Sequence, residues 1–150
     1  MKRFLSWRPF AFVLVAISVL TLVSVPAQAA RRAYVSHGTA HFTGPNDFVG
    51  AGTATHLGFY NEVGHVVFSG TENATVLHLE ASAIYTAANR DHLYAVVTGE
   101  LNGVTGAIIA TVTYTGGTGR FANATGTAIL VGQILSDGSL EVAVHGSIDY

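Results

Sequence analysis

The stretch Leu140-Glu-Val-Ala-Val-His-Gly-Ser-Ile-Asp-Tyr150 alternates two kinds of residue to the end of the sequence. Its even-numbered positions hold apolar residues and one glycine, whereas its odd-numbered positions hold mostly polar residues. Successive side chains of a β-strand point to opposite faces, so a period of two predicts a strand with one buried face and one wet face.

The same period of two recurs upstream, and no stretch between the turn residues has a convincing helical period. Asp137-Gly138 and Asn102-Gly103 are typical of tight hairpin connections between neighbouring strands. The expected strands are residues 34–42, 52–57, 64–69, 75–85, 92–101, 106–114, 126–135 and 140–150.

Short connections between these strands favour an up-and-down order, in which each strand pairs with the next. We therefore expect an all-β fold, a single eight-stranded antiparallel β-barrel spanning residues 30–150. Closure removes exposed sheet edges and leaves an interior that is filled by side chains or holds one small ligand. A two-sheet sandwich is the alternative fold.

Residues 1–29 have the three parts of a secretory signal peptide. Lys2, Arg3 and Arg8 supply positive charge, an apolar run covers residues 10–25, and Ala27-Gln-Ala29 is a small-x-small cleavage site. An uncleaved anchor is the alternative, but the run is shorter than the roughly 20 residues that a spanning helix needs. We expect export to the periplasm or the extracellular space, with no stable membrane insertion after cleavage.

The composition of residues 30–150 limits the kinds of partner that the domain can bind and the side-chain chemistry that is available to it. This part holds all nine acidic residues, four arginines, no lysine and no cysteine. Such an acidic domain lacks the basic surface that phosphate backbones require, so nucleic acid is not an expected partner. Lysine Schiff bases, cysteine nucleophiles and thiolate metal sites are excluded.

Three segments carry a family resemblance: residues 50–58 (GAGTATHLG), 86–93 (TAANRDHL) and 116–126 (GGTGRFANATG). Together they resemble a group of small secreted bacterial proteins with no established activity. The third segment is also similar to the Gly-Gly-Thr-Gly-x-Phe-x-x-Ala-x-Gly stretch of the allene oxide cyclase and dirigent barrels. That resemblance implies an eight-stranded antiparallel barrel with an apolar cavity, and barrels of this kind form dimers or trimers. The bacterial group usually carries glycine where this chain has Arg90, so we expect a looser or differently typed turn there.

The leading hypothesis for function is a secreted module that binds a small apolar ligand inside the barrel. The residues expected to line the interior are Leu77, Leu79, Tyr85, Ile148 and Tyr150, with Phe121 closing one end. The sequence identifies no catalytic residue, no cofactor and no metal site.

Three alternatives remain open. A cyclase-like or isomerase-like enzyme would need one or two polar groups inside the barrel. A structural or interaction domain of the cell envelope would self-associate through the outer surface of its sheet. An outer-membrane barrel is a further alternative, because such barrels often end on an aromatic residue as this chain does at Tyr150.

Other candidate motifs have simpler explanations. The run Gly116-Gly-Thr-Gly119 has no helix after it and therefore does not fit a phosphate loop. Of the seven histidines, His37 and His41 share one expected strand but lie roughly 13 Å apart, and the other five lie on different strands, which does not indicate a zinc site. Glu80 and Glu100 could face each other as a carboxylate pair, but the phase of its strand places Glu80 on the solvent side.

Overall fold

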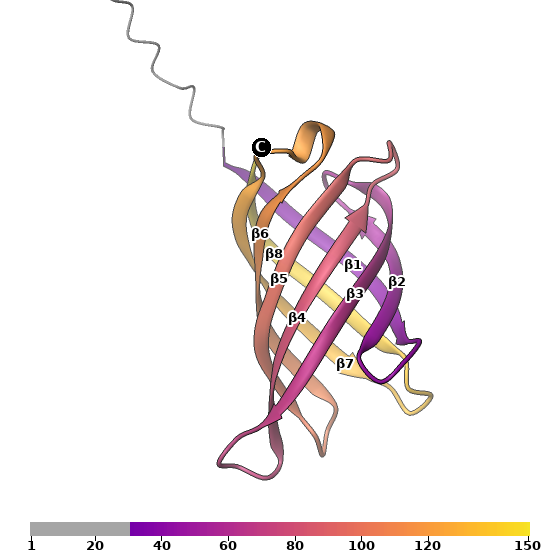
Figure 1. Cartoon of the computed structure of the whole chain (residues 1–150), viewed down its shortest axis with the longest axis vertical. Coiled ribbons are helices and arrows are strands. Elements are labelled where there is room, and N and C mark those ends of the chain that lie inside the picture. Colours follow the sequence, from indigo (N-terminus) through magenta and orange to yellow (C-terminus); the bar gives the residue numbers. More distant parts are fainter. Residues whose placement is uncertain (1–30) are drawn as a thin grey trace, which may run out of the picture.

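The computed structural model describes residues 31–150, and the predicted signal peptide at residues 1–29 lies outside the described residues. The described chain forms a closed barrel of eight antiparallel strands, which confirms the predicted fold (Figure 1). The strands are β1 (Arg32–Phe42), β2 (Asp47–Ala54), β3 (Gly58–Gly70), β4 (Val76–Thr86), β5 (His92–Asn102), β6 (Ala107–Gly117), β7 (Thr125–Ile134) and β8 (Leu140–Asp149).

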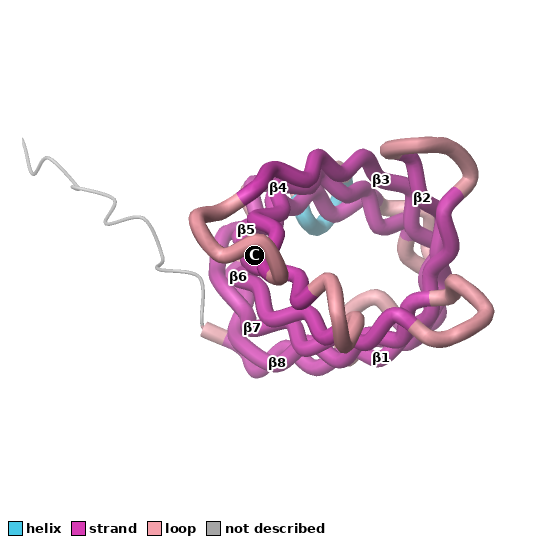
Figure 2. Tube along the Cα trace, turned by 90° about the horizontal axis from the view of Figure 1, so that it is seen from below, coloured by secondary structure: helices cyan, strands magenta, loops and turns pink. Residues whose placement is uncertain are grey.

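The sheet closes because the first strand pairs with the last. β1 lies antiparallel to β8, with Arg32 opposite Ile148 and Ala40 opposite Leu140. Every other pairing joins consecutive strands, so the chain forms a single ring and not the two sheets of a sandwich. Figure 2, seen from the lower end of Figure 1, shows this ring with the one helical turn at its far end.

Alternation along each strand sorts the side chains between the interior and the outer surface. In β6, the even-numbered residues Ile108, Ala110, Val112 and Tyr114 are buried, whereas the odd-numbered residues from Ile109 to Thr115 are exposed. Removal of these apolar side chains from water supplies the main driving force for closure. The core therefore lies inside the ring.

The two ends of the barrel are built differently. At the upper end, β6 is followed by a single 3₁₀ turn, η1 (Gly119–Phe121), whose Phe121 side chain is fully buried. The sequence predicts no helix after the glycine-rich run at residues 116–119. The structure differs from that prediction by this single turn. No helix in residues 31–150 is long and apolar enough to cross a membrane. The lower end carries the connections 43–46, 71–75, 103–106 and 135–139, and no helical turn covers it (Figure 1).

The hairpin between β2 and β3 lies earlier in the chain than the sequence predicts. Residues 55–57 form the turn, whereas the expected strand at residues 52–57 runs through them. His56 Nε2 lies 2.8 Å from the Ala33 carbonyl oxygen, and the Thr55 backbone N–H donates to the Val35 carbonyl, so the turn is tied to β1. Gly58 follows with φ of 68°, a left-handed conformation that glycine adopts without a steric penalty.

The turn between β4 and β5 is as tight as a glycine would make it, although Arg90 occupies the position. Arg90 has φ of 70°, the left-handed conformation that a glycine would adopt, so the expectation of a looser or differently typed turn is wrong. The neighbouring side chains hold this conformation, because Asn89 Nδ2 donates to Asp91 Oδ2 at 2.7 Å. The Arg90 N–H also donates to the Ala87 carbonyl at 2.8 Å.

Candidate functional site

A cavity occupies the middle and lower part of the barrel interior and opens toward the lower end. The space open to the centre of a water molecule is about 80 Å³, and the atom-free space, including the open mouth, is about 820 Å³. Most of its wall is apolar. The wall residues are Ala40, Val66, Leu79, Ala81, Val97, Ile108, Leu130, Ile134, Leu140, Val142 and Val144, and the mouth residues are His41, Phe42, Phe48 and Phe68.

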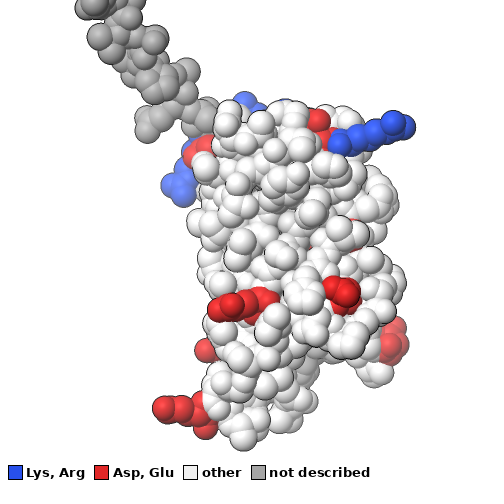
Figure 3. Space-filling model, viewed as in Figure 1, with Lys and Arg blue, Asp and Glu red and all other residues white. Residues whose placement is uncertain are grey.

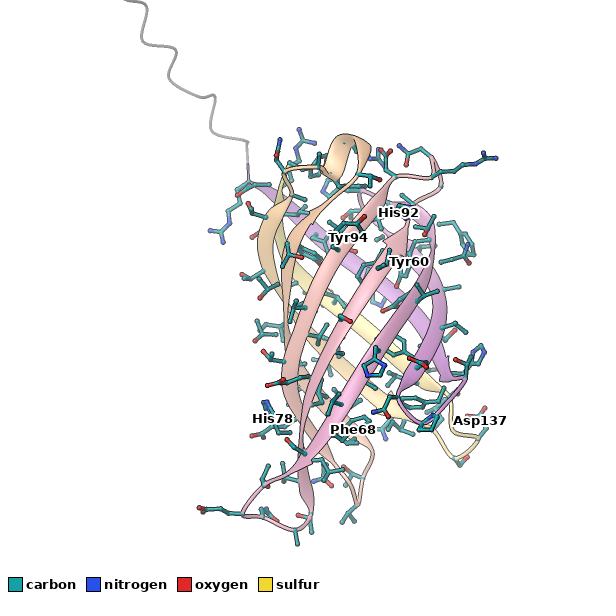
Figure 4. The ribbon with its side chains drawn as sticks, in the orientation of Figure 1. Tyr60, Phe68, His78, His92, Tyr94 and Asp137 are labelled. Atoms are coloured by element: carbon teal, nitrogen blue, oxygen red, sulfur yellow. The ribbon has the colours of Figure 1, made fainter. Side chains whose placement is uncertain are left out.

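Four polar side chains form the deep end of the cavity. Ser36 comes from β1, Tyr60 and Glu62 come from β3, and Tyr85 comes from β4. In Figure 4, Tyr60 lies in the upper half of the barrel and Phe68 lies near the lower end of the same strand, so the two labels mark the depth of the site. The cavity thus has an apolar body and one polar floor.

Glycines opposite the polar floor make room for its larger members. A Cβ on Gly38 would lie 2.6 Å from the Tyr60 hydroxyl, and one on Gly52 would lie 2.7 Å from it. A Cβ on Gly50 would lie 3.2 Å from Glu62 Oε2. These three positions on β1 and β2 face the floor, so their lack of a side chain is what allows Tyr60 and Glu62 to turn inward.

Tyrosines surround Glu62. Tyr85 is directly opposite it on β4, and the Tyr60 and Tyr85 rings meet edge to face with centroids 5.4 Å apart. Above them, the Tyr34 and Tyr114 rings lie 5.0 Å apart. All four tyrosines are buried, so aromatic rings cover the side of the polar floor that faces away from the mouth.

Burial raises the pKa of Glu62 to about 7, and a hydrogen bond from the Tyr85 hydroxyl offsets part of that rise. Burial also raises the pKa of Tyr60 to about 12, with the Glu62 charge adding to the shift. The same desolvation raises the pKa of Tyr34, Tyr85 and Tyr114 well above the usual value. Near neutral pH the tyrosines are therefore neutral hydroxyl groups, and Glu62 is the group that changes charge.

No arginine in residues 31–150 reaches Glu62. Arg31 and Arg32 lie at the start of β1, Arg90 lies in the β4–β5 turn and Arg120 lies in η1, all at the upper end. Figure 3 shows the basic side chains at that end together with some acidic ones, whereas the charged side chains over the lower half are all acidic. Among the described residues, Glu62 is the only buried residue whose side chain can carry a charge near neutral pH.

The structure places the predicted interior residues in two different regions. Leu79 and Tyr85 line the cavity, and Leu77 packs against the core without lining it. Phe121 and Ile148 are fully buried, and the Phe121 and Tyr150 rings lie 4.9 Å apart. These last three residues belong to the closed upper end and do not line the cavity.

The polar floor is not among the features predicted from the sequence. The expected strand at residues 64–69 leaves out Tyr60 and Glu62, which share the inward phase of Val66 and Phe68 in β3. A charged residue in the inward phase of an apolar strand face is the signal that would have identified Glu62. This signal can be recognised once the hairpin is placed at residues 55–57, because the position of the hairpin sets the phase of β3.

The other candidate groups do not assemble into a site. Glu80 pairs with Thr98 and Glu100 pairs with His78, so the two carboxylates are not opposite each other, and both are exposed. His37 and His145 meet on the outer surface with ring centroids 5.9 Å apart. Within residues 31–150, no three side chains of the metal-binding types lie close enough together to hold an ion.

Comparison with known proteins gives no match, either to a protein-family model, to a curated protein or to a solved structure. The resemblance of residues 50–58, 86–93 and 116–126 to the secreted bacterial group and the cyclase and dirigent barrels therefore stays a prediction. The fold and the cavity stand on the structure of this chain alone.

Proposed function

We propose that this barrel binds one small, elongated apolar molecule in its cavity, with a polar group of that molecule against Ser36, Tyr60, Glu62 and Tyr85. A cavity with an apolar wall, one closed end and a single polar floor is the observation that carries the proposal. Ligand sites in proteins commonly combine a mainly apolar lining with a few polar groups that fix the orientation of the ligand.

The dimensions favour a slender ligand. The space for water centres, about 80 Å³, is small beside the roughly 300–1,000 Å³ of pockets for drug-sized ligands, so it suits an alkyl chain or a small ring better than a bulky polycycle. Each buried CH₂ group contributes about 0.8 kcal/mol, so a chain of about eight carbons supplies roughly 6 kcal/mol before the entropic cost of binding. Affinity in the micromolar range then requires the polar floor to contribute as well.

Titration with 1-octanol, followed by methyl NMR, tests the proposal. We expect saturable shifts of the methyl groups of Val66, Leu79 and Leu130, with none for Ile109 and Val131 on the outer surface. Ala81→Leu adds side-chain volume to the cavity wall and is expected to abolish the shifts. Ser82→Leu places the same side chain on the outside of the same strand and should leave them unchanged. Shifts confined to the outer surface, or equal in both variants, would reject the proposal.

A second candidate function is proton transfer within the bound molecule, as in an isomerase. The specific observation is Glu62, a carboxyl group in the cavity whose pKa of about 7 suits general acid–base catalysis near neutral pH. Mass spectrometry of the natural ligand after incubation with the protein in D₂O tests this candidate. Deuterium at carbon with the wild type but not with Glu62→Gln supports catalysis, and no incorporation with either protein rejects it.

A further inference from the structure

We propose that the ligand carries a cationic ammonium group, which pairs with Glu62 at the deep end of the cavity while the apolar part extends toward the lower mouth. This inference rests on the proposed function and names the class of ligand for the same site. Its basis is the juxtaposition of a buried, unpaired carboxyl group with aromatic rings at the deep end of the cavity. Among the described residues no arginine enters this cavity, and its one histidine, His41, lies at the mouth.

Glu62 has no cationic partner among the described residues. Its side chain lines the cavity and is only 8 % exposed, and Tyr85 is the one side chain that lowers its pKa by hydrogen bonding. The groups around it are Ser36 and Tyr34 of β1, Gly50 of β2, Tyr60 of its own strand and Tyr85 of β4. None of these groups is positively charged.

An ammonium group relieves the cost that folding has already imposed on this carboxylate. Desolvation usually opposes a buried ion pair, because both charges must leave water. Here the carboxylate is desolvated before the ligand arrives, so only the incoming cation still has to lose its water. A charge-assisted hydrogen bond to Glu62 then forms in a low-dielectric site, where such bonds are strongest.

The tyrosine rings favour the same charge. The face of a tyrosine ring carries the negative end of the ring quadrupole and attracts a cation that lies over it. Tyr60 and Tyr85 both line the cavity beside Glu62. A carboxylate ligand would meet the opposite effect, with repulsion from Glu62 added.

The charge around the mouth points in the same direction. Asp47, Glu72, Asp137 and Glu141 all lie in or next to the lower connections, whereas every arginine of the described chain lies at the upper end (Figure 3). An exposed rim of this kind acts over about one Debye length and raises the local concentration of cations. The rim assists entry, and the buried pair with Glu62 provides the selectivity.

Three probes with the same eight-carbon tail test the inference: octylamine, 1-octanol and octanoate, titrated into wild type, Glu62→Gln and Glu80→Gln. At pH 8 we expect the wild type to bind octylamine at least about ten-fold more tightly than 1-octanol, and octanoate most weakly. Glu62→Gln is expected to lose this preference and still bind 1-octanol. Glu80→Gln, which removes an exposed carboxylate from the outer face of β4, should keep it.

A second measurement on the wild type needs no variant. Between pH 8 and pH 5.5, octylamine stays protonated while Glu62 takes up a proton, so the preference over 1-octanol should decline. Binding of 1-octanol without any preference for octylamine at pH 8, or a preference that persists in Glu62→Gln, would overturn this inference alone. Failure of all three probes to bind would overturn the proposed function together with it.

Discussion

Glu62 and Tyr85 face each other across β3 and β4 inside the barrel, and the tyrosine hydroxyl donates the side-chain hydrogen bond that steadies the buried carboxylate. A neutral hydroxyl group stabilises a carboxylate less than a cation would. The pKa of Glu62 therefore lies at about 7, against 4.5 for an ordinary glutamate.

Stability should fall as the pH rises through the pKa of Glu62. The folded protein holds this proton up to about pH 7, whereas the unfolded chain releases it near pH 4.5, so the folded state binds more protons in between. The contribution is fully present below pH 4.5 and is lost as pH passes about 7. At 1.36 kcal/mol for each pKa unit, the loss is about 3 kcal/mol.

Urea unfolding of wild type and Glu62→Gln at several pH values isolates this contribution, because the other titrating groups are common to both proteins. The free energy of unfolding of Glu62→Gln minus that of the wild type should grow by about 3 kcal/mol between pH 4.5 and pH 8. A difference that does not change with pH would mean that Glu62 is not buried in the way described.

Gly52→Ala should destabilise the barrel. A Cβ at this position would lie 2.3 Å from the His37 carbonyl oxygen and 2.7 Å from the Tyr60 hydroxyl, so β1 and the tyrosine would both have to move. Overpacking of this kind costs about 1–3 kcal/mol. Gly70→Ala is the matched control, since nothing lies within 4 Å of its Cβ. Chemical denaturation should show a loss for Gly52→Ala only, and equal stabilities would contradict the close approach.

Phe121→Ala should cost about 3–5 kcal/mol, because its ring is fully buried where it closes the upper end. Phe59→Ala removes the same side chain from the outer surface, where Phe59 is 59 % exposed, and should change stability by less than about 0.5 kcal/mol. Thermal unfolding of the two variants provides the comparison. Similar melting temperatures would show that η1 does not seal the barrel.

Arg90→Gly should stabilise the protein by up to about 1 kcal/mol. Glycine removes the penalty of roughly 1–2 kcal/mol that other residues incur in the left-handed conformation. Part of this gain is offset because glycine loses more conformational entropy on folding. Arg90→Ala keeps the unfavourable φ of 70° and should gain nothing. If both substitutions had the same effect on the free energy of unfolding, backbone conformation would not be the cause.

Local pattern was enough to predict the barrel, because strand alternation and turn residues are encoded in neighbouring positions. The alternation of β8 and the Asp137-Gly138 turn are examples, and closure follows from the need to cover the strand edges. The hairpin at residues 55–57 was missed because its ties are long-range. Thr55 and His56 bond to β1, about twenty residues away in the sequence.

The polar floor was beyond the reach of the sequence pattern for a similar reason. Glu62 reads as a surface residue unless its strand phase is known, and that phase depends on where the hairpin lies. The space for it comes from Gly50 on a different strand. The alternation of their own strand is enough to predict that Leu79 and Tyr85 point inward. Their separation along the barrel from Phe121 and Ile148 depends on how the closed ring brings the strands together.

Native mass spectrometry of the protein purified from its own source tests the central claim, that the cavity holds a ligand, most directly. We predict one discrete additional mass per chain, lost on denaturation, and absent from Ala81→Leu but present in Ser82→Leu prepared in the same way. An apoprotein mass for the wild type, unchanged after equilibration with octylamine and with 1-octanol, would contradict the claim.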